Sequence, residues 1–217
     1  MRAPKVRTEV RREQIALAAL GLVARRGWHG FSVDALAREV GVVPSAIYRH
    51  YRSKGAVLDA LLGLISRRLK ENVAAVRREA PDPAGRLLLL LERHMRMVRE
   101  NPGIPRVIFS EEVMAGEGVR RARLYRLIQG YLSQVADMIR AGQVARQLRR
   151  DAGAGTLAVM FLGLIQPAAI LHLASRGRFD AAGFQRKAWR LYEQMITVGA
   201  GGRRAPRGSG AARRKQR

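Results

Sequence analysis

The sequence predicts an all-α protein, and three observations support this fold class. Apolar residues recur at spacings of three and four along most of the 217 residues. Glycine and proline separate these apolar stripes in the way that is typical of helix ends. No segment shows the convincing alternation of apolar and polar residues that indicates a half-buried strand. Because 47% of the residues are hydrophobic, a chain of this length can bury a real core.

The composition argues against several classes of protein. The chain has no cysteine, which excludes disulfide frameworks and thiolate metal sites and suits a reducing compartment. Its first residues, MRAPKVRTEVRREQ, lack the apolar core of a secretory signal peptide. The longest apolar run, Thr156 to Ala174, contains Gln166, Pro167 and His172 and is therefore a poor membrane span. We expect a cytoplasmic protein that does not associate with a membrane.

The net charge is +24, and its distribution is more informative than its size. Of the 41 basic residues 36 are arginine, a ratio that a GC-rich genome would favour for reasons unrelated to binding. Residues 1–54 and residues 203–217 each carry a net charge of +7, so that charge density is highest at the two ends. A positive surface attracts nucleic-acid phosphates, and this partner is expected at those ends.

The first two helices are predicted from their stripes and their caps. Gly27 can end the first helix, and residues 28–31 form a turn. Ser32 can cap the second helix by accepting a hydrogen bond from a free backbone N–H, and Gly41 ends it. The apolar stripe of the first helix consists of Ile15, Ala18, Ala19, Leu22 and Val23.

The remaining helices follow from the same signals. Pro44 suits the first turn of a short third helix, with Ile47 facing inward. Ser53 can cap a fourth helix that runs to about Arg78, although the capping box is lost and the helix start is expected to be loose. Further helices are expected at about 83–100, 104–115, 117–145, 152–176 and 180–198, with a kink at Pro167.

A short second helix, a tight glycine turn and a third helix with outward polar and aromatic groups indicate a helix-turn-helix, whose later helix enters the DNA major groove. The stretch FSVDALAREVGVVPSAIYRHYRSKGAVL resembles the DNA-binding half of the TetR family of bacterial transcriptional regulators, over about residues 8–58. The resemblance implies a DNA-binding domain at 1–54 and a helical effector-binding and dimerisation domain at 55–198. Residues 199–217 have no apolar periodicity and are expected to form a disordered basic tail.

Candidate DNA contacts combine groups for phosphates with groups for bases. Ser32 can offer its hydroxyl and free backbone amides to a phosphate. Val43 and Ala46 stand where the family often has hydroxyl side chains, so direct readout shifts toward Arg49, which can reach a guanine edge or a phosphate. Tyr51 is expected to close the small core instead of touching DNA. The full set of candidates is Ser32, Val43, Pro44, Ser45, Ala46, Tyr48, Arg49, His50 and Lys54, of which the resemblance implies backbone contacts for the tyrosine, the lysine and often the histidine.

The larger half is expected to hold a ligand pocket among the fourth, fifth, seventh and eighth helices. Flexible, aromatic and isolated polar side chains line adaptable apolar sites, although ordinary core packing remains the alternative for each of them. The pocket candidates are Met95, Phe109, Met114, Tyr125, Tyr131, Met160, Gln166 and His172.

The resemblance also implies that the last two helices pair with those of a second copy. Intrachain core packing is the alternative, because an apolar stripe looks alike in either role. The candidates for this homodimer interface are Leu157, Phe161, Leu164, Leu171, Leu191 and Met195.

Together these features predict a transcriptional regulator that binds a palindromic operator in double-stranded DNA as a homodimer. A small lipophilic effector is expected to release it from DNA, as a repressor. The alternative is a non-specific architectural nucleic-acid-binding protein that depends on the basic ends. An enzyme is not expected, because the four histidines are scattered and the catalytic motifs are missing, and no metal or cofactor is expected.

Overall fold

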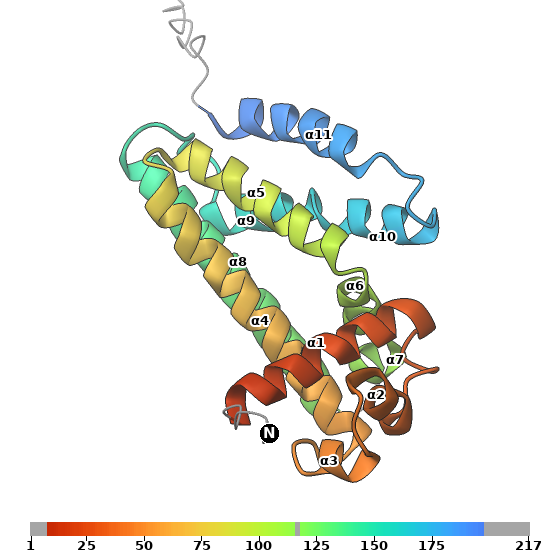
Figure 1. The fold of residues 1–217 in the computed structure, drawn as a ribbon. Helices are drawn as coiled ribbons and strands as arrows, with labels where there is room; N and C mark the ends of the chain where they lie inside the picture. Colours follow the sequence, from red (N-terminus) through yellow and green to blue (C-terminus); the bar gives the residue numbers. More distant parts are fainter. Residues whose placement is uncertain (1–7, 116–117, 198–217) are drawn as a thin grey trace, which may run out of the picture.

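The computed structural model describes residues 8–115 and 118–197, and every regular element in these two ranges is a helix (Figure 1). The prediction of an all-α fold is confirmed. One isolated antiparallel bridge, between Leu148 and Thr197, is the sole strand-like pairing among the described residues. The helices are α1 (Thr8–Arg26), α2 (Val33–Val40), α3 (Pro44–Tyr48), α4 (Lys54–Glu79), α5 (Pro83–Glu100), α6 (Gly103–Ile108), α7 (Glu111–Met114), α8 (Gly118–Val144), α9 (Ala154–Gly163), α10 (Gln166–Ala174) and α11 (Ala181–Ile196).

Local capping chemistry fixes the helix-turn-helix. The Ser32 hydroxyl accepts a hydrogen bond from the backbone N–H of Ala35 at 3.1 Å, as the sequence predicts for an N-cap. Gly41 has a φ of 72°, in the left-handed region that glycine adopts without a steric cost. The N–H of Val42 then donates to the carbonyl of Ala37 at 2.9 Å, which closes the helix end. These bonds set the angle at which α3 leaves α2.

Helix α4 connects the two halves of the molecule. Ser53 caps it by accepting a hydrogen bond from Ala56 N–H at 3.1 Å, so its start is fixed even though the capping box is missing. Figure 1 shows α4 running alongside α8 from the three N-terminal helices toward α5 and α9. Residues of α4 therefore contact both the N-terminal helices and the helices of the larger half.

Two of the predicted long helices are each divided into two. The segment predicted at 104–115 forms α6 and α7, because Ser110 takes an extended conformation and its hydroxyl donates to the carbonyl of Val107. The segment predicted at 152–176 forms α9 and α10. Pro167 lies in the first turn of α10, where its missing N–H and its ring prevent a continuous helix with the turn that ends at Gly163.

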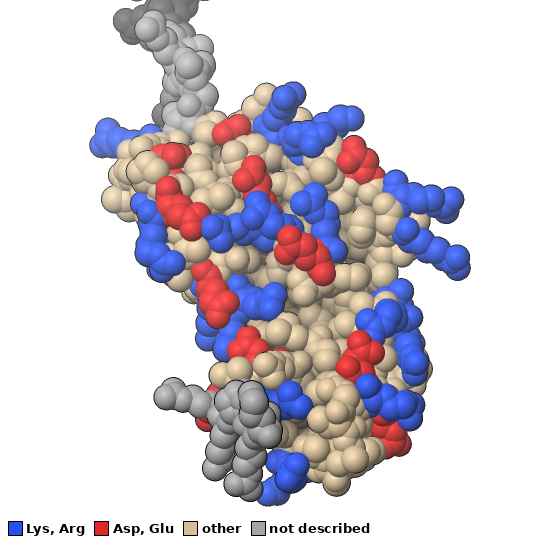
Figure 2. Space-filling view, viewed as in Figure 1, with Lys and Arg blue, Asp and Glu red and all other residues tan. Residues whose placement is uncertain are grey.

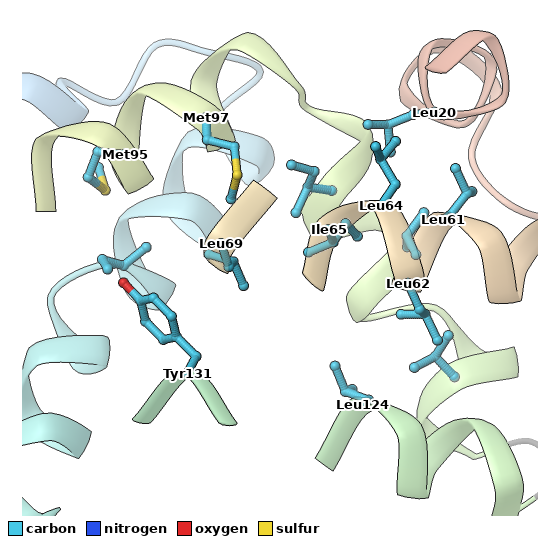
Figure 3. Packing of buried hydrophobic residues seen from close by; sticks show 14 of the residues in the cluster. Leu20, Leu61, Leu62, Leu64, Ile65, Leu69, Met95, Met97, Leu124 and Tyr131 are labelled. Carbon is cyan, nitrogen blue, oxygen red and sulfur yellow. The ribbon is translucent and has the colours of Figure 1, made fainter. Parts of the chain in front are cut away.

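One continuous apolar core joins the two halves. Figure 3 shows Leu61, Leu62 and Leu64 of α4 between Leu20 of α1 and Leu124 of α8. All five are at most 5% exposed, and burial of each such side chain stabilises the fold by about 1.5–3 kcal/mol. The predicted disordered tail, 199–217, lies outside the described residues.

Candidate nucleic-acid interface and apolar cavity

Helix α3 presents one face to solvent and anchors the other in the core. Ile47 is fully buried, whereas Val43 is 63% exposed and Tyr48 is 49% exposed. Ser32, Pro44, Ser45 and Arg49 are also exposed, and Ala46 is half-buried. Figure 2 shows Lys and Arg side chains flanking the lower end of the molecule, where Figure 1 places α2 and α3.

Arg12 locks the segment that follows α3 onto α1. The Tyr51 hydroxyl donates to the carbonyl of Arg12 at 2.8 Å, and the Arg12 guanidinium lies 5.4 Å from the centre of the tyrosine ring. Tyr51 is 4% exposed, which confirms its predicted structural role. Desolvation, and then the positive charges of Arg12, Arg49 and Arg11, lower the pKa of His50. His50 is therefore neutral at neutral pH and can donate a hydrogen bond without adding charge.

Lys54 ties the start of α4 to the turn between α1 and α2. Its ammonium donates to the carbonyl of Trp28 at 3.0 Å and lies 4.9 Å from the centre of the Trp28 ring. The Trp28 ring in turn stacks on Phe31 at a centroid distance of 4.9 Å. An ammonium has three N–H donors, so this contact leaves others free for a phosphate.

A small apolar cavity lies inside the larger half, between α4, α5, α6, α8 and the α9–α10 pair. Its volume is about 70 Å³. Aliphatic side chains form most of its wall, and His94, Tyr131 and Gln166 are its polar groups. None of its lining residues is Asp, Glu, Lys or Arg, so an apolar ligand fits it better than a charged one.

His94 and Tyr131 form a buried polar pair in the cavity wall. His94 Nδ1 and the Tyr131 hydroxyl are 2.9 Å apart, and the two rings meet edge to face. Burial lowers the pKa of His94 to about 4 and raises the pKa of Tyr131. The pair is therefore neutral at physiological pH.

The N-terminal part of the chain matches the family model described as bacterial regulatory proteins, tetR family, over residues 15–61. This match contains α2, the glycine turn and α3. These residues form a TetR-family DNA-binding domain. A chain with this domain is a DNA-binding transcriptional regulator.

The relatives of this protein include nucleoid occlusion factors. SlmA of Alteromonas mediterranea is 26% identical over 203 residues, which cover 89% of this chain and 99% of the relative. SlmA of Haemophilus influenzae is 22% identical over 203 residues, which cover 89% of this chain and 93% of the relative.

Solved structures share the whole fold at low identity. The fatty acid degradation regulator FadR from Bacillus halodurans has a TM-score of 0.73 and 18% identity, covering 88% of this chain and 96% of its own. FadR from Bacillus subtilis, solved in complex with stearoyl-CoA, has a TM-score of 0.70 and 19% identity, covering 85% and 98%.

Three of the eight predicted pocket residues line the cavity, namely Phe109, Tyr131 and Gln166. The structure does not bring the other five there. Met95 is buried in the core, and His172 is half-buried in α10. The exposed fractions of the remaining three are 49% for Met114, 62% for Tyr125 and 43% for Met160.

Sequence reasoning missed His94 as a cavity residue. A signal was present, because Leu87, Leu91 and His94 follow one another at spacings of four and then three on the inward stripe of α5. A polar side chain on such a stripe must find a buried partner, and here that partner is Tyr131.

The predicted dimer residues separate into buried and exposed groups. Leu157 and Phe161 are at most 2% exposed and pack inside one protomer against Tyr192, so the structure corrects their assignment to intrachain core. Leu164 and Met195 are half-buried, whereas Leu171 is 46% and Leu191 is 70% exposed.

The α9–α10 face, which we define as Val159, Met160, Ile170 and Leu171, is exposed and apolar. No charged residue lies anywhere between Ala154 and Ala174. That segment is also long and apolar enough to cross a membrane by length and composition, and one third of its most apolar window is buried in the fold. An exposed apolar face of this kind is a candidate interaction surface.

The His94 pKa predicts a pH-dependent stability. Its folded-state value of about 4 lies below the ordinary value of 6.5, so the unfolded chain binds the proton first as the pH falls. The free energy of unfolding should fall by about 3 kcal/mol between pH 6.5 and pH 4 through this group. Denaturant melts across that range should show a smaller decrease for His94→Gln. An equal decrease in both proteins would contradict the assignment.

Proposed function

We propose that this TetR-family protein represses transcription by binding a palindromic operator as a homodimer, and that a small lipophilic ligand releases it. One observation carries the proposal. Helix α4 begins beside the exposed recognition helix α3, and its middle residues Ile65 and Leu69 line the apolar cavity. The fold shared with fatty acid regulators, one of them solved with stearoyl-CoA, supports a lipophilic ligand.

We assign the exposed groups of α2, α3 and α4 to two roles: some bind backbone phosphates and position the protein on DNA, and others contact the bases and recognise the sequence. Ser32 and Tyr48 are assigned to phosphate oxygens, since each offers a hydroxyl from an exposed position. His50 and Lys54 are assigned to phosphates as well. Arg49 is assigned to a guanine edge, because a guanidinium can donate two parallel hydrogen bonds there. Ser45 can bind a base or a phosphate, and the apolar surfaces of Val43, Pro44 and Ala46 suit thymine methyl groups.

Dimerisation is assigned to the α9–α10 face together with Leu191 of α11. Two such faces can cover each other about a twofold axis, which removes their apolar side chains from water. A palindromic operator requires this symmetry, because its half-sites must meet two recognition helices about one helical turn apart.

Release follows from the contacts of α6. Ile104 and Ile108 of this helix line the cavity, and Gly103 packs directly against Leu20 of α1. A cavity of about 70 Å³ holds only about two water molecules, so a ligand has to push its walls apart. The displaced α6 then moves α1 and the DNA-binding end. Coupling of this kind typically changes DNA affinity by 1–3 kcal/mol.

Selection of duplexes from random and genomic DNA at about 150 mM salt tests the DNA-binding part. We expect a palindrome to be enriched by the wild-type chain. Arg49→Ala should relax the preference at one position of each half-site, with a cost of about 1–3 kcal/mol. Tyr48→Phe should weaken binding to all sequences alike.

The same selection distinguishes a sequence-specific regulator from the alternative, a non-specific architectural nucleic-acid-binding protein. A chain that ends at residue 198 should keep the operator preference, because the recognition residues remain. Uniform recovery of all sequences, unchanged by Arg49→Ala, would instead assign DNA binding to the basic ends.

Nucleoid occlusion is a second candidate, favoured by the SlmA relatives, which are aligned over 89% of this chain. A nucleoid occlusion factor needs sites spread over the chromosome, whereas a local repressor needs sites beside the genes that it controls. Genome-wide mapping of the bound sites therefore distinguishes the two.

A further inference from the structure

A second hollow, the α4–α8 groove, lies beside the apolar cavity and has a volume of about 450 Å³. Its charged lining residues are Asp59, Lys70, Arg123 and Arg126. Asp59 pairs with Arg123 at 3.0 Å and therefore offsets that cation. Within the described residues, neither Lys70 nor Arg126 forms an ion pair, so the groove carries two uncompensated positive charges.

Three side chains form a thin partition between the groove and the cavity. Leu69, Leu127 and Tyr131 line both hollows. Figure 3 shows Leu69 of α4 and Tyr131 of α8 in the same part of the core. One side of the partition is a cationic surface open to water, and the other is an apolar interior. The two hollows together are polar at one end and apolar at the other.

We propose that the ligand is a long-chain amphiphile whose anionic head group binds Lys70 and Arg126 in the α4–α8 groove, and whose hydrocarbon chain enters the cavity past Leu69, Leu127 and Tyr131. This inference rests on the proposed function, because it names the ligand class for the same sensory half. The orientation follows from desolvation. An anion inside the cavity would meet no cation and would lose its hydration. In the groove it can pair with a cation and stay hydrated.

The size of the cavity explains why such a ligand would act as a switch. The chain cannot fit into about 70 Å³, so it must displace the leucines of the partition and the wall formed by α6. An occupied state then differs in shape from the DNA-bound state, as release requires.

A binding series with one chain length tests both ends of the ligand. Hexadecanoate and hexadecanoyl-CoA carry an anionic head, hexadecanol carries a neutral one, and coenzyme A alone carries no chain. Displacement of a fluorescent fatty acid from the full chain should show binding of at least one of the two anions, binding of the alcohol about tenfold weaker, and none of coenzyme A. Equal binding of hexadecanol and the anions would overturn the head-group assignment, and failure of all four would overturn the ligand class.

Charge variants locate the head group. Arg126→Gln and Lys70→Gln should each weaken binding of the anion by about three- to fivefold and leave hexadecanol unchanged, because an exposed ion pair contributes only modestly. Arg121→Gln is the matched control, since Arg121 is exposed on the same helix outside the groove. An equal loss in all three variants would mean that net charge, and not this groove, attracts the anion.

A groove-filling variant tests the path of the chain. A Cβ added at Gly130 meets no atom within 4 Å, so Gly130→Leu can fold while its side chain fills the groove beside Tyr131. We expect an unchanged or higher melting temperature and at least a tenfold loss of binding for both anion and alcohol. Intact binding would exclude this route. Operator selection on ligand-free protein is independent of these outcomes, so a chain that selects an operator but binds no amphiphile remains a regulator with another ligand.

Discussion

Replacing Met160 by glutamate should convert the protein to a monomer and reduce operator affinity at least a hundredfold. Met160 is 43% exposed on the charge-free α9–α10 face, so the variant chain can still fold. Each proposed dimer would receive two carboxylates in an apolar interface, and each unpaired buried charge costs several kcal/mol. Every 1.4 kcal/mol is a tenfold change in affinity, and a monomer can hold only one half-site.

Val144→Glu is the control for this experiment. Val144 is 83% exposed at the end of α8, so the same charge change occurs at an apolar position outside the proposed interface. Sedimentation velocity should give a monomer for Met160→Glu and a dimer for Val144→Glu, with matching circular dichroism spectra. A dimer in both variants would place the twofold axis elsewhere on the surface.

The helix-turn-helix could be predicted in detail because its determinants are local in sequence. The Ser32 cap and the left-handed Gly41 each act within a few residues of their own position. Ser110 and Pro167 also act locally, yet the sequence predicts only a kink at Pro167 and no interruption at Ser110. In the structure each of these residues separates two helices. Their effect depends on whether the neighbouring helices pack better against one straight helix or against two short ones.

The cavity could be predicted only in part, because it results from the packing of helices that are distant in sequence. Tyr131 and Tyr125 are both aromatic residues of α8, but only Tyr131 lies on the inward stripe that contains Leu124 and Val135. A shift of one residue turns a helical side chain by 100° and separates core from solvent. The same rotation exposes the side chain of Met160 in α9 to solvent and buries the side chain of the next residue, Phe161, in the core.

Gly103→Ala should destabilise the protein by about 1–3 kcal/mol and weaken operator binding about five- to hundredfold. A Cβ at this position would lie 2.3 Å from the backbone oxygen of Leu20, which is held in the middle of α1. Backbone in a packed helix cannot move aside, so α6 must retreat from α1. The retreat imitates the displacement that we propose for the ligand, because Ile104 and Pro105 of the same helix line the cavity.

Measuring both ligand affinity and operator affinity tests whether α6 couples the cavity to the DNA-binding end. If α6 transmits the signal, Gly103→Ala should raise ligand affinity while it lowers operator affinity, since the two sites bias one equilibrium in opposite directions. Gly118→Ala is the control, because Gly118 is also the first residue of a helix and an added Cβ there meets no atom within 4 Å. It should leave both affinities unchanged and raise stability slightly. A Gly103→Ala protein that loses stability while both affinities stay constant would show that α6 supports the fold without connecting the cavity to the DNA-binding end.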